Sequence, residues 1–377
     1  MNHKRVSRKE ILRRGCILIG CIIFFLFLYQ YNQIEKATLL TTDNRSFEKA
    51  VVTEIVKDNL QESGTRTGEQ IVKLKLLTGE KKGTIIEANS SSSYLFGAVC
   101  KPGMKVIALV STANDTIAAS VYSYDRTFLL YGIVIVFLLT VWLLGGKKGF
   151  AAVCGLVFTF ICIIYLFLPM IYRGVSPCWA AILVVAITTI VTMYLIGGAS
   201  RKTISAIVGT IAGVGIAGIF AFICGKLTQI SGYNVSDIDS LVYIQEKTGI
   251  KIGELLFAGI LIAALGAVMD VAMSIASTIQ EIHDKNPALT RKELFWSGIH
   301  VGRDVMGTMS NTLVLAFTGG SINTLVFVYS YNYSHLQLMN MYDIGIEIIQ
   351  GISASMGVIL TVPFVAFVSA WLLKNKK

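Results

Sequence analysis

Long apolar runs follow one another along most of this chain, separated by short polar stretches. The first run lies at 15–31, directly after a basic segment at 1–14. Seven more runs follow, at 127–144, 149–171, 178–196, 203–224, 255–278, 297–318 and 348–372. Each is close to the roughly 20 residues that cross about 30 Å of hydrocarbon. The pattern predicts a polytopic α-helical membrane protein with about eight transmembrane helices.

Residues 32–126 follow a different pattern, in which apolar and polar positions alternate. Alternation of this kind is typical of half-buried β-strands. Five candidate strands are found at 50–56, 70–76, 84–88, 105–110 and 117–122. Short strands of this number in one small region predict a closed, OB-like all-β barrel. The serine-rich segment 89–94 is expected to be an exposed loop.

The distribution of positive charge predicts the topology. The net charge is +10, and its lysines and arginines gather beside the apolar runs, for example at 147–148, 201–202 and 374–377. With a cytoplasmic N-terminus these patches fall on the cytoplasmic side, as the positive-inside rule expects. We therefore expect an uncleaved anchor at 15–31, an extracytoplasmic domain at 32–126, a seven-helix membrane domain at 127–373 and a cytoplasmic end at 374–377.

Two segments between the runs do not read as plain loops. The segment 225–254 contains an amphipathic stretch, which would lie on the membrane or cap a cavity. The segment 321–331 is apolar but too short to span the bilayer, and Gly319 and Gly320 precede it. It is expected to form a half-helix, a re-entrant piece or a bent extension of the seventh span. Gly209 and Gly213 in the fifth run form a small-xxx-small surface that favours close helix packing.

Acidic residues within the apolar runs are the first candidates for chemistry, because charge at bilayer depth is costly and mostly functional. Asp270 and Asp304 each begin the same pattern, with polar residues four and seven positions later that share one helix face. The residues predicted to bind an ion or substrate are Asp270, Ser274, Ser277, Arg303, Asp304, Thr308 and Asn311. Carboxylate, hydroxyl and amide oxygens suit a hard cation, and a proton relay needs a similar arrangement.

Arg303 leaves three interpretations open. It pairs with Asp270 as a structural ion pair, it belongs to an ion or proton site, or the Arg303-Asp304 pair lies at the cytoplasmic interface. Glu347 and Gln350, at the start of the last run, are candidates for a gate, although a solvated helix start is the favoured explanation.

Other classes of site find little support in the sequence. The seven cysteines and four histidines show no metal-ligand spacing, so no cofactor is expected and the identity of any metal stays open. No hydrolase, metalloprotease or nucleotide-binding motif is present, which makes an enzyme the less favoured class. The excess of positive charge is explained by lysines and arginines in the loops beside the membrane, so nucleic acid is not an expected partner.

Two stretches resemble a known family. They are Leu265–Ile275 and the run from Ser297 to Leu313, which includes the string GRDVMGTMSNT, and Gly357–Pro363 also fits. Over roughly residues 127–372 the chain is similar to the YibE/F family of bacterial membrane proteins. The resemblance implies a multi-pass protein of the bacterial cytoplasmic membrane, commonly interpreted as a transporter or permease. The N-terminal β region has the place expected in the longer, YibE-like members.

Three functional hypotheses follow. The leading one is a secondary transporter or permease for a cation or small solute, which uses the polar site on the sixth and seventh spans. The alternative is a non-transporting scaffold in the lipid bilayer that presents its outer domain to an envelope or secretion protein. The third is an intramembrane hydrolase with an Asp270–Asp304 dyad. Substrate, coupling ion, direction and oligomeric state stay open at this stage.

Overall fold

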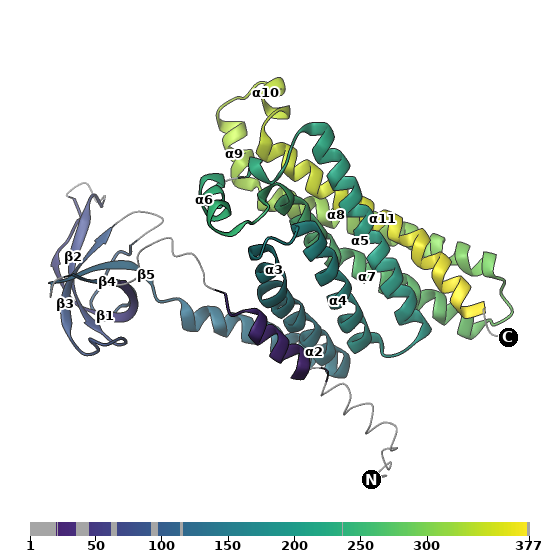
Figure 1. Ribbon diagram of the computed structural model, residues 1–377, viewed down its shortest axis with the longest axis horizontal. Coiled ribbons are helices and arrows are strands. Elements are labelled where there is room, and N and C mark those ends of the chain that lie inside the picture. Colours follow the sequence, from purple (N-terminus) through teal and green to yellow (C-terminus); the bar gives the residue numbers. More distant parts are fainter. Residues whose placement is uncertain are drawn as a thin grey trace, which may run out of the picture. The chain divides into compact units, whose positions relative to one another are not determined.

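The computed structural model describes residues 20, 22–34, 45–61, 66–91, 97–113, 116–235 and 237–374. The chain divides into two compact units (Figure 1). One unit is Lys36–Thr140, and the other combines Met1–Glu35 with Val141–Lys377.

Five strands close a small barrel in the first unit, as the alternating pattern predicts. They are β1 (Arg45–Lys57), β2 (Glu69–Leu76), β3 (Ile85–Ser91), β4 (Lys105–Ala113) and β5 (Thr116–Tyr124). Their order around the barrel is β1-β2-β3-β5-β4, with β3 and β5 parallel and the other neighbours antiparallel. Alternate residues of β2 point inward, so that Val72 and Leu74 are fully buried beside Val52 and Val106.

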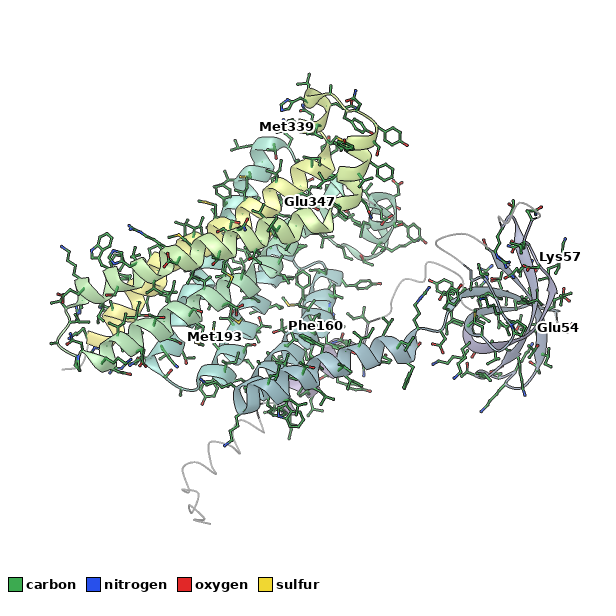
Figure 2. The ribbon with its side chains drawn as sticks, turned by 180° about the vertical axis from the view of Figure 1, so that it is seen from behind. Glu54, Lys57, Phe160, Met193, Met339 and Glu347 are labelled. Atoms are coloured by element: carbon green, nitrogen blue, oxygen red, sulfur yellow. The ribbon has the colours of Figure 1, made fainter. Side chains whose placement is uncertain are left out.

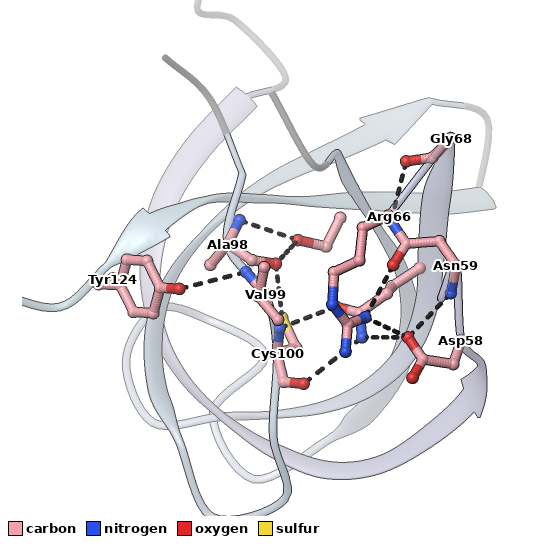
Figure 3. Close-up of polar contacts among 10 residues, drawn as sticks. Asp58, Asn59, Arg66, Gly68, Ala98, Val99, Cys100 and Tyr124 are labelled. Carbon is pink, nitrogen blue, oxygen red and sulfur yellow. Dashed lines mark hydrogen bonds and ion pairs between the residues drawn. The ribbon is translucent and has the colours of Figure 1, made fainter. Parts of the chain in front are cut away.

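A hydrogen-bonded polar cluster lies at the edge of this core (Figure 3). Asp58 accepts hydrogen bonds from Arg66 and from Gln70, and these bonds hold the pKa of its carboxyl below the usual range. The side-chain oxygen of Gln70, which is 1% exposed, accepts the backbone N–H of Cys100 at 2.8 Å. Burial raises the pKa of the Cys100 thiol. Every one of these polar groups has a partner, which identifies the cluster as a structural device of the barrel.

Helices make up the second unit and the end of the first. They are α2 (Thr127–Cys162), the π-helical turn Ile163–Phe167, α3 (Leu168–Tyr172), α4 (Pro177–Gly197), α5 (Arg201–Thr228), α6 (Ile238–Thr248), α7 (Leu255–Lys285), α8 (Arg291–Gly320), α9 (Ile322–Ser330), α10 (His335–Met339) and α11 (Tyr342–Lys374). Among the described residues, five helical runs are long and apolar enough to cross a membrane, or six if the bent pair α8 and α9 counts as one span. The sequence predicts about eight, and that number is not established by the helices alone.

The number of candidate spans in the structure differs from the predicted eight for two local reasons. The run Thr127–Tyr172 is one of the five and has 46 residues, which is about 69 Å of helix and more than twice the hydrocarbon thickness. Its backbone breaks at Gly146 (φ 54°, ψ −131°), between the two runs that the sequence places here. Trp142 and Phe150 pack on each other across that break, with ring centroids 5.3 Å apart. The first predicted anchor is described only as the short helix Ile22–Tyr31, and the rest of 15–31 lies largely outside the described residues.

The short helix Ile22–Tyr31 lies along the last part of the Thr127–Tyr172 run. The rings of Phe24 and Phe158 are 5.7 Å apart, and the amide of Asn32 donates to the carbonyl of Tyr165 at 2.7 Å. From Phe24 to Asn32 the contacts move from Phe158 to Tyr165, so residue numbers increase in the same direction along both segments. The two segments are therefore parallel.

At the centre of the helical unit is α7, which contacts α4, α5, α8 and α11 (Figure 1). The helices α5 and α11 pack closely on each other through small residues. A Cβ atom added to Gly209 or Gly213 would overlap Val365 or Thr361 of α11. This result confirms the packing role that the sequence predicts for the two glycines. In contrast, α8 contacts α7 and α11 on one side and leaves its other side uncovered, since only Leu294, Gly298 and Gly302 are buried.

The two irregular segments also take defined forms. The segment 321–331 is α9, which departs from α8 at an angle of 63° with Ser321 at the break. This bend fits a bent extension of the seventh span and a re-entrant piece equally. In the segment 225–254, the amphipathic stretch forms α6.

Candidate functional site

Asp270 belongs to the one side of α7 that other helices leave uncovered. This stripe consists of Gly259, Ala263, Gly266, Asp270 and Ser274, at intervals of three and four residues. Such intervals place side chains on one face of a helix. Except for Asp270 these residues are small, so the carboxylate lies beside backbone and hydroxyl groups. Ser277 continues the face one turn further and is half-buried.

The uncovered side of α8 is polar and carries the second predicted set. Arg303, Asp304, Thr308 and Asn311 are all exposed, together with Gly307. The Thr308 hydroxyl donates to the carbonyls of Asp304 and Val305 within its own helix, at 3.2 and 3.0 Å. Its oxygen lone pairs stay available to a ligand. We call the following residues the polar face: Gly266, Asp270, Ser274, Asp304, Gly307, Thr308 and Asn311.

The depth of the two aspartates follows from the contact between their helices. A Cβ atom on Gly298 of α8 would meet the side chain of Ile279 of α7. From this level Asp270 lies nine residues away along α7, and Asp304 lies six residues away along α8 in the same direction. At 1.5 Å per residue the carboxylates differ in depth by about 4.5 Å, or about one turn.

Arg303 lies on the flank of α8 that is nearer to α11. Eleven residues, or about three turns, separate Arg303 from Val314, so the two share a side of α8. Val314 and Phe317 lie near Gly351, which places this side against α11. Asp304, the next residue, is rotated by about 100° to the other flank. Among the described residues no ion pair joins Arg303 to Asp270 or Asp304.

Two carboxylates that form no ion pair among the described residues can hold a proton or a cation. Of the part of the chain that the structure describes, no group of three or more His, Cys, Asp or Glu residues could hold a metal ion. The polar face therefore offers an acidic, hydroxyl-lined surface.

Glu347 lies at a second place, where α8, α9 and α11 meet (Figure 2). It is in the second turn of α11, half-buried, with its Oε2 atom buried and without a hydrogen-bond partner. The carboxylate borders a cavity of about 300 Å³. Gln350 is half-buried nearby on α11 and is not on the cavity wall. The structure thus keeps Glu347 apart from the polar face.

Buried hydroxyl groups within the bundle are a feature that sequence reasoning passes over. Among the described residues, six of the buried hydroxyl oxygens without a partner are those of Thr189, Thr192, Thr210, Ser353, Ser355 and Ser369. They come from α4, α5 and α11. The only signal in the sequence is the density of Ser and Thr in these spans, which is common in membrane helices.

Comparisons with known proteins support the resemblance in the sequence. The family description "YibE/F-like protein" matches residues 133–375, which is well over half of the chain. The chain therefore belongs to the YibE/F-like family. No curated protein and no solved structure matches it.

Proposed function

We propose that this member of the YibE/F-like family is a secondary transporter or permease that moves a cation or small polar solute along the polar face. The observation that supports it is the exposure of Asp270 and Asp304 on two adjacent helices of membrane-spanning character. Contact between a carboxylate and lipid hydrocarbon has a high cost in free energy. The polar face therefore needs water, a solute or a polar protein partner beside it. The small residues next to Asp270 leave room for such a solute.

The proposed location is the bacterial cytoplasmic membrane, with both termini in the cytoplasm and 32–126 outside. The direction of the short helix Ile22–Tyr31 supports this topology. Alternation across the membrane requires the first and third predicted spans to point the same way. The contacts of Phe24 with Phe158 and of Asn32 with Tyr165 agree with that requirement.

The experiment is uptake into proteoliposomes that contain the full chain. A panel of alkali and divalent cations is offered with and without an imposed proton gradient. We expect wild-type uptake to exceed that of empty liposomes and Asp270→Asn to reduce it by about tenfold or more, because a permanently neutral amide cannot exchange a proton or balance a cation. Asp343→Asn is the matched control, since it removes an exposed acid at the start of α11.

Failure of the wild type to move any solute of the panel, or equal uptake by Asp270→Asn, contradicts the proposal. The hydrolase hypothesis is less favoured, because a dyad that shares one proton needs both carboxylates at one level. The estimated difference in depth is about one turn.

A scaffold role is the second candidate, and the barrel supplies the observation that favours it. A cavity of about 450 Å³ opens on the barrel, with Arg45, Glu48, Glu80 and Lys81 on its wall. Charges of both signs suit a polar protein partner outside the membrane. On this hypothesis a double charge reversal, Glu80→Lys with Lys81→Glu, removes the cellular function of the chain while Asp270→Asn preserves it. The transporter proposal expects the opposite result for both variants.

A further inference from the structure

The cavity beside Glu347 combines an acidic group with apolar walls. Its apolar lining is formed by Val314, Phe317, Leu325, Ile344, Ile348 and Ile352. Glu347 is the charged residue on this wall, and its buried Oε2 atom accepts no hydrogen bond. A carboxylate oxygen without a donor in such surroundings is costly to keep. A ligand that brings a positive charge would remove that cost.

The break between α8 and α9 brings the end of one helix and the start of the next to the wall of the cavity. α8 ends at Gly320, and the N–H of Ser321 donates to the carbonyls of Phe317 and Thr318 at 3.2 Å each. The partial negative charge at the end of α8 and the partial positive charge at the start of α9 oppose each other there. The Thr318 hydroxyl, also on the wall, donates to Val314 within its helix and is not committed to Glu347. The carboxylate of Glu347 therefore determines which sign of charge the cavity favours in a ligand.

The apolar lining of the cavity determines which class of cation it can bind. A hydrated inorganic ion prefers a shell of several oxygen ligands, and the apolar lining offers few. An organic cation instead places its apolar body against the aliphatic side chains and its charge beside the carboxylate. The aromatic ring of Phe317 offers a face that also attracts cations. A cavity of about 300 Å³ is at the small end of the range of ligand sites.

We propose that the cavity between α8, α9 and α11 is a binding site for a small organic cation, with a substituted ammonium group beside Glu347 and an apolar body against Phe317 and Ile348. The site is separate from the polar face and does not depend on the transport proposed there.

The test is equilibrium binding of labelled benzyltrimethylammonium to the full chain in lipid nanodiscs, with empty nanodiscs as background. We expect saturable binding to the wild type. Glu347→Gln keeps the shape of the side chain and removes its charge, and should weaken binding by about tenfold or more. Asp343→Asn removes one exposed acid four residues earlier on the same helix and should leave binding unchanged.

A second variant tests the cavity without touching its charge. A Cβ atom on Gly351 would lie 3.9 Å from Phe317 and 4.0 Å from Val314, which is ordinary contact. Gly351→Leu therefore fills the cavity and should abolish binding while α11 keeps its fold. Gly215→Leu is its control, because Gly215 has no atom within 4 Å of its added Cβ and lies on α5.

Three results would overturn the proposal. They are the absence of saturable binding by the wild type, unchanged binding by Glu347→Gln, and equal competition by neopentylbenzene, the neutral carbon analogue of the probe. Asp270→Asn should bind the probe like the wild type, so a failed uptake experiment and a failed binding experiment stay distinguishable.

Discussion

The barrel and the helical bundle treat polar groups in opposite ways. In the barrel, Asp58, Arg66 and Gln70 are joined in one hydrogen-bonded cluster. In the bundle, Asp270 and Asp304 are uncovered and Glu347 has a buried oxygen with no partner. Satisfied polar groups contribute to a fold, whereas unsatisfied ones in a membrane protein point to function. The bundle instead obtains its stability from close contacts between small residues, as between α5 and α11.

The largest expected effect is on the packing of the bundle. Gly213→Leu forces a side chain into the space of Thr361 and Val268, so that α5 and α11 must separate. We expect a loss of stability at or above the roughly 1–3 kcal/mol typical of overpacking, which would show as little folded protein in detergent. Size-exclusion chromatography and thermal unfolding measure it. Gly215→Leu, on the same helix but without close neighbours, should remain folded.

A smaller effect is expected in the barrel. Gln70→Ala leaves the buried N–H of Cys100 without its acceptor and takes a donor from Asp58. Loss of a buried partner costs about 1–3 kcal/mol. The control is Lys73→Ala, which breaks an ion pair with Glu54 whose two side chains are 44% and 59% exposed. An exposed pair contributes about 0–1 kcal/mol. Hydrogen exchange of β2 in the full chain would show equal protection in both variants if the cluster were unimportant.

The cluster also predicts how the barrel responds to acid. The bonds from Arg66 and Gln70 depress the pKa of Asp58 in the folded state. A depressed carboxyl pKa stabilises the fold above the unfolded pKa of about 3.9, and this contribution is lost as the pH falls through the folded value. Protection of β2, corrected for intrinsic exchange, should therefore decline below about pH 4 in the wild type. Asp58→Asn should show a weaker dependence in this range, and an identical pH profile would contradict the assignment.

The smallest effect is expected at an unpartnered hydroxyl of the bundle. Ser353 is fully buried and its Oγ atom has no hydrogen-bond partner. Ser353→Ala should change the free energy of unfolding by no more than about 0.5 kcal/mol, since no bond is lost and a buried polar group is removed. A cost near that of Gln70→Ala would show that the two regions do not differ as described.

The sequence predicts the elements better than their relations. Alternation identifies all five strands, and the extended apolar runs correspond to the long helices. The serine-rich segment 89–94 is wrongly expected to be a loop at its start, because Ser90 is fully buried in β3 and donates to the carbonyl of Ala98 at 2.7 Å. A prediction from hydrophobic periodicity relies on apolar residues at the buried positions. It therefore misses a buried position occupied by a polar residue that bonds to the backbone, as Ser90 does.

The site is predictable only in part for a similar reason. Helical spacing places Asp270 with Ser274, and Asp304 with Thr308, because those relations lie within one helix. The separation of Arg303 from the acids depends on which flank of α8 packs against α11, which sequence spacing does not contain. Likewise the cavity at Glu347 depends on the bend between α8 and α9 at Ser321, which is 26 positions earlier in the chain.

The central claim is that the polar face meets water or solute, and cysteine accessibility tests it most directly. Ser274→Cys, one turn from Asp270, and Ile219→Cys, an apolar position that is 63% exposed on α5, are placed separately in a chain freed of its own cysteines. Each is treated in intact membranes with a charged, membrane-impermeant thiol reagent, which reacts only where water reaches the thiolate. The account predicts rapid labelling at position 274 and none at 219. Equal resistance at both positions would show that hydrocarbon or packed protein covers the face, and the proposed route for a solute would be contradicted.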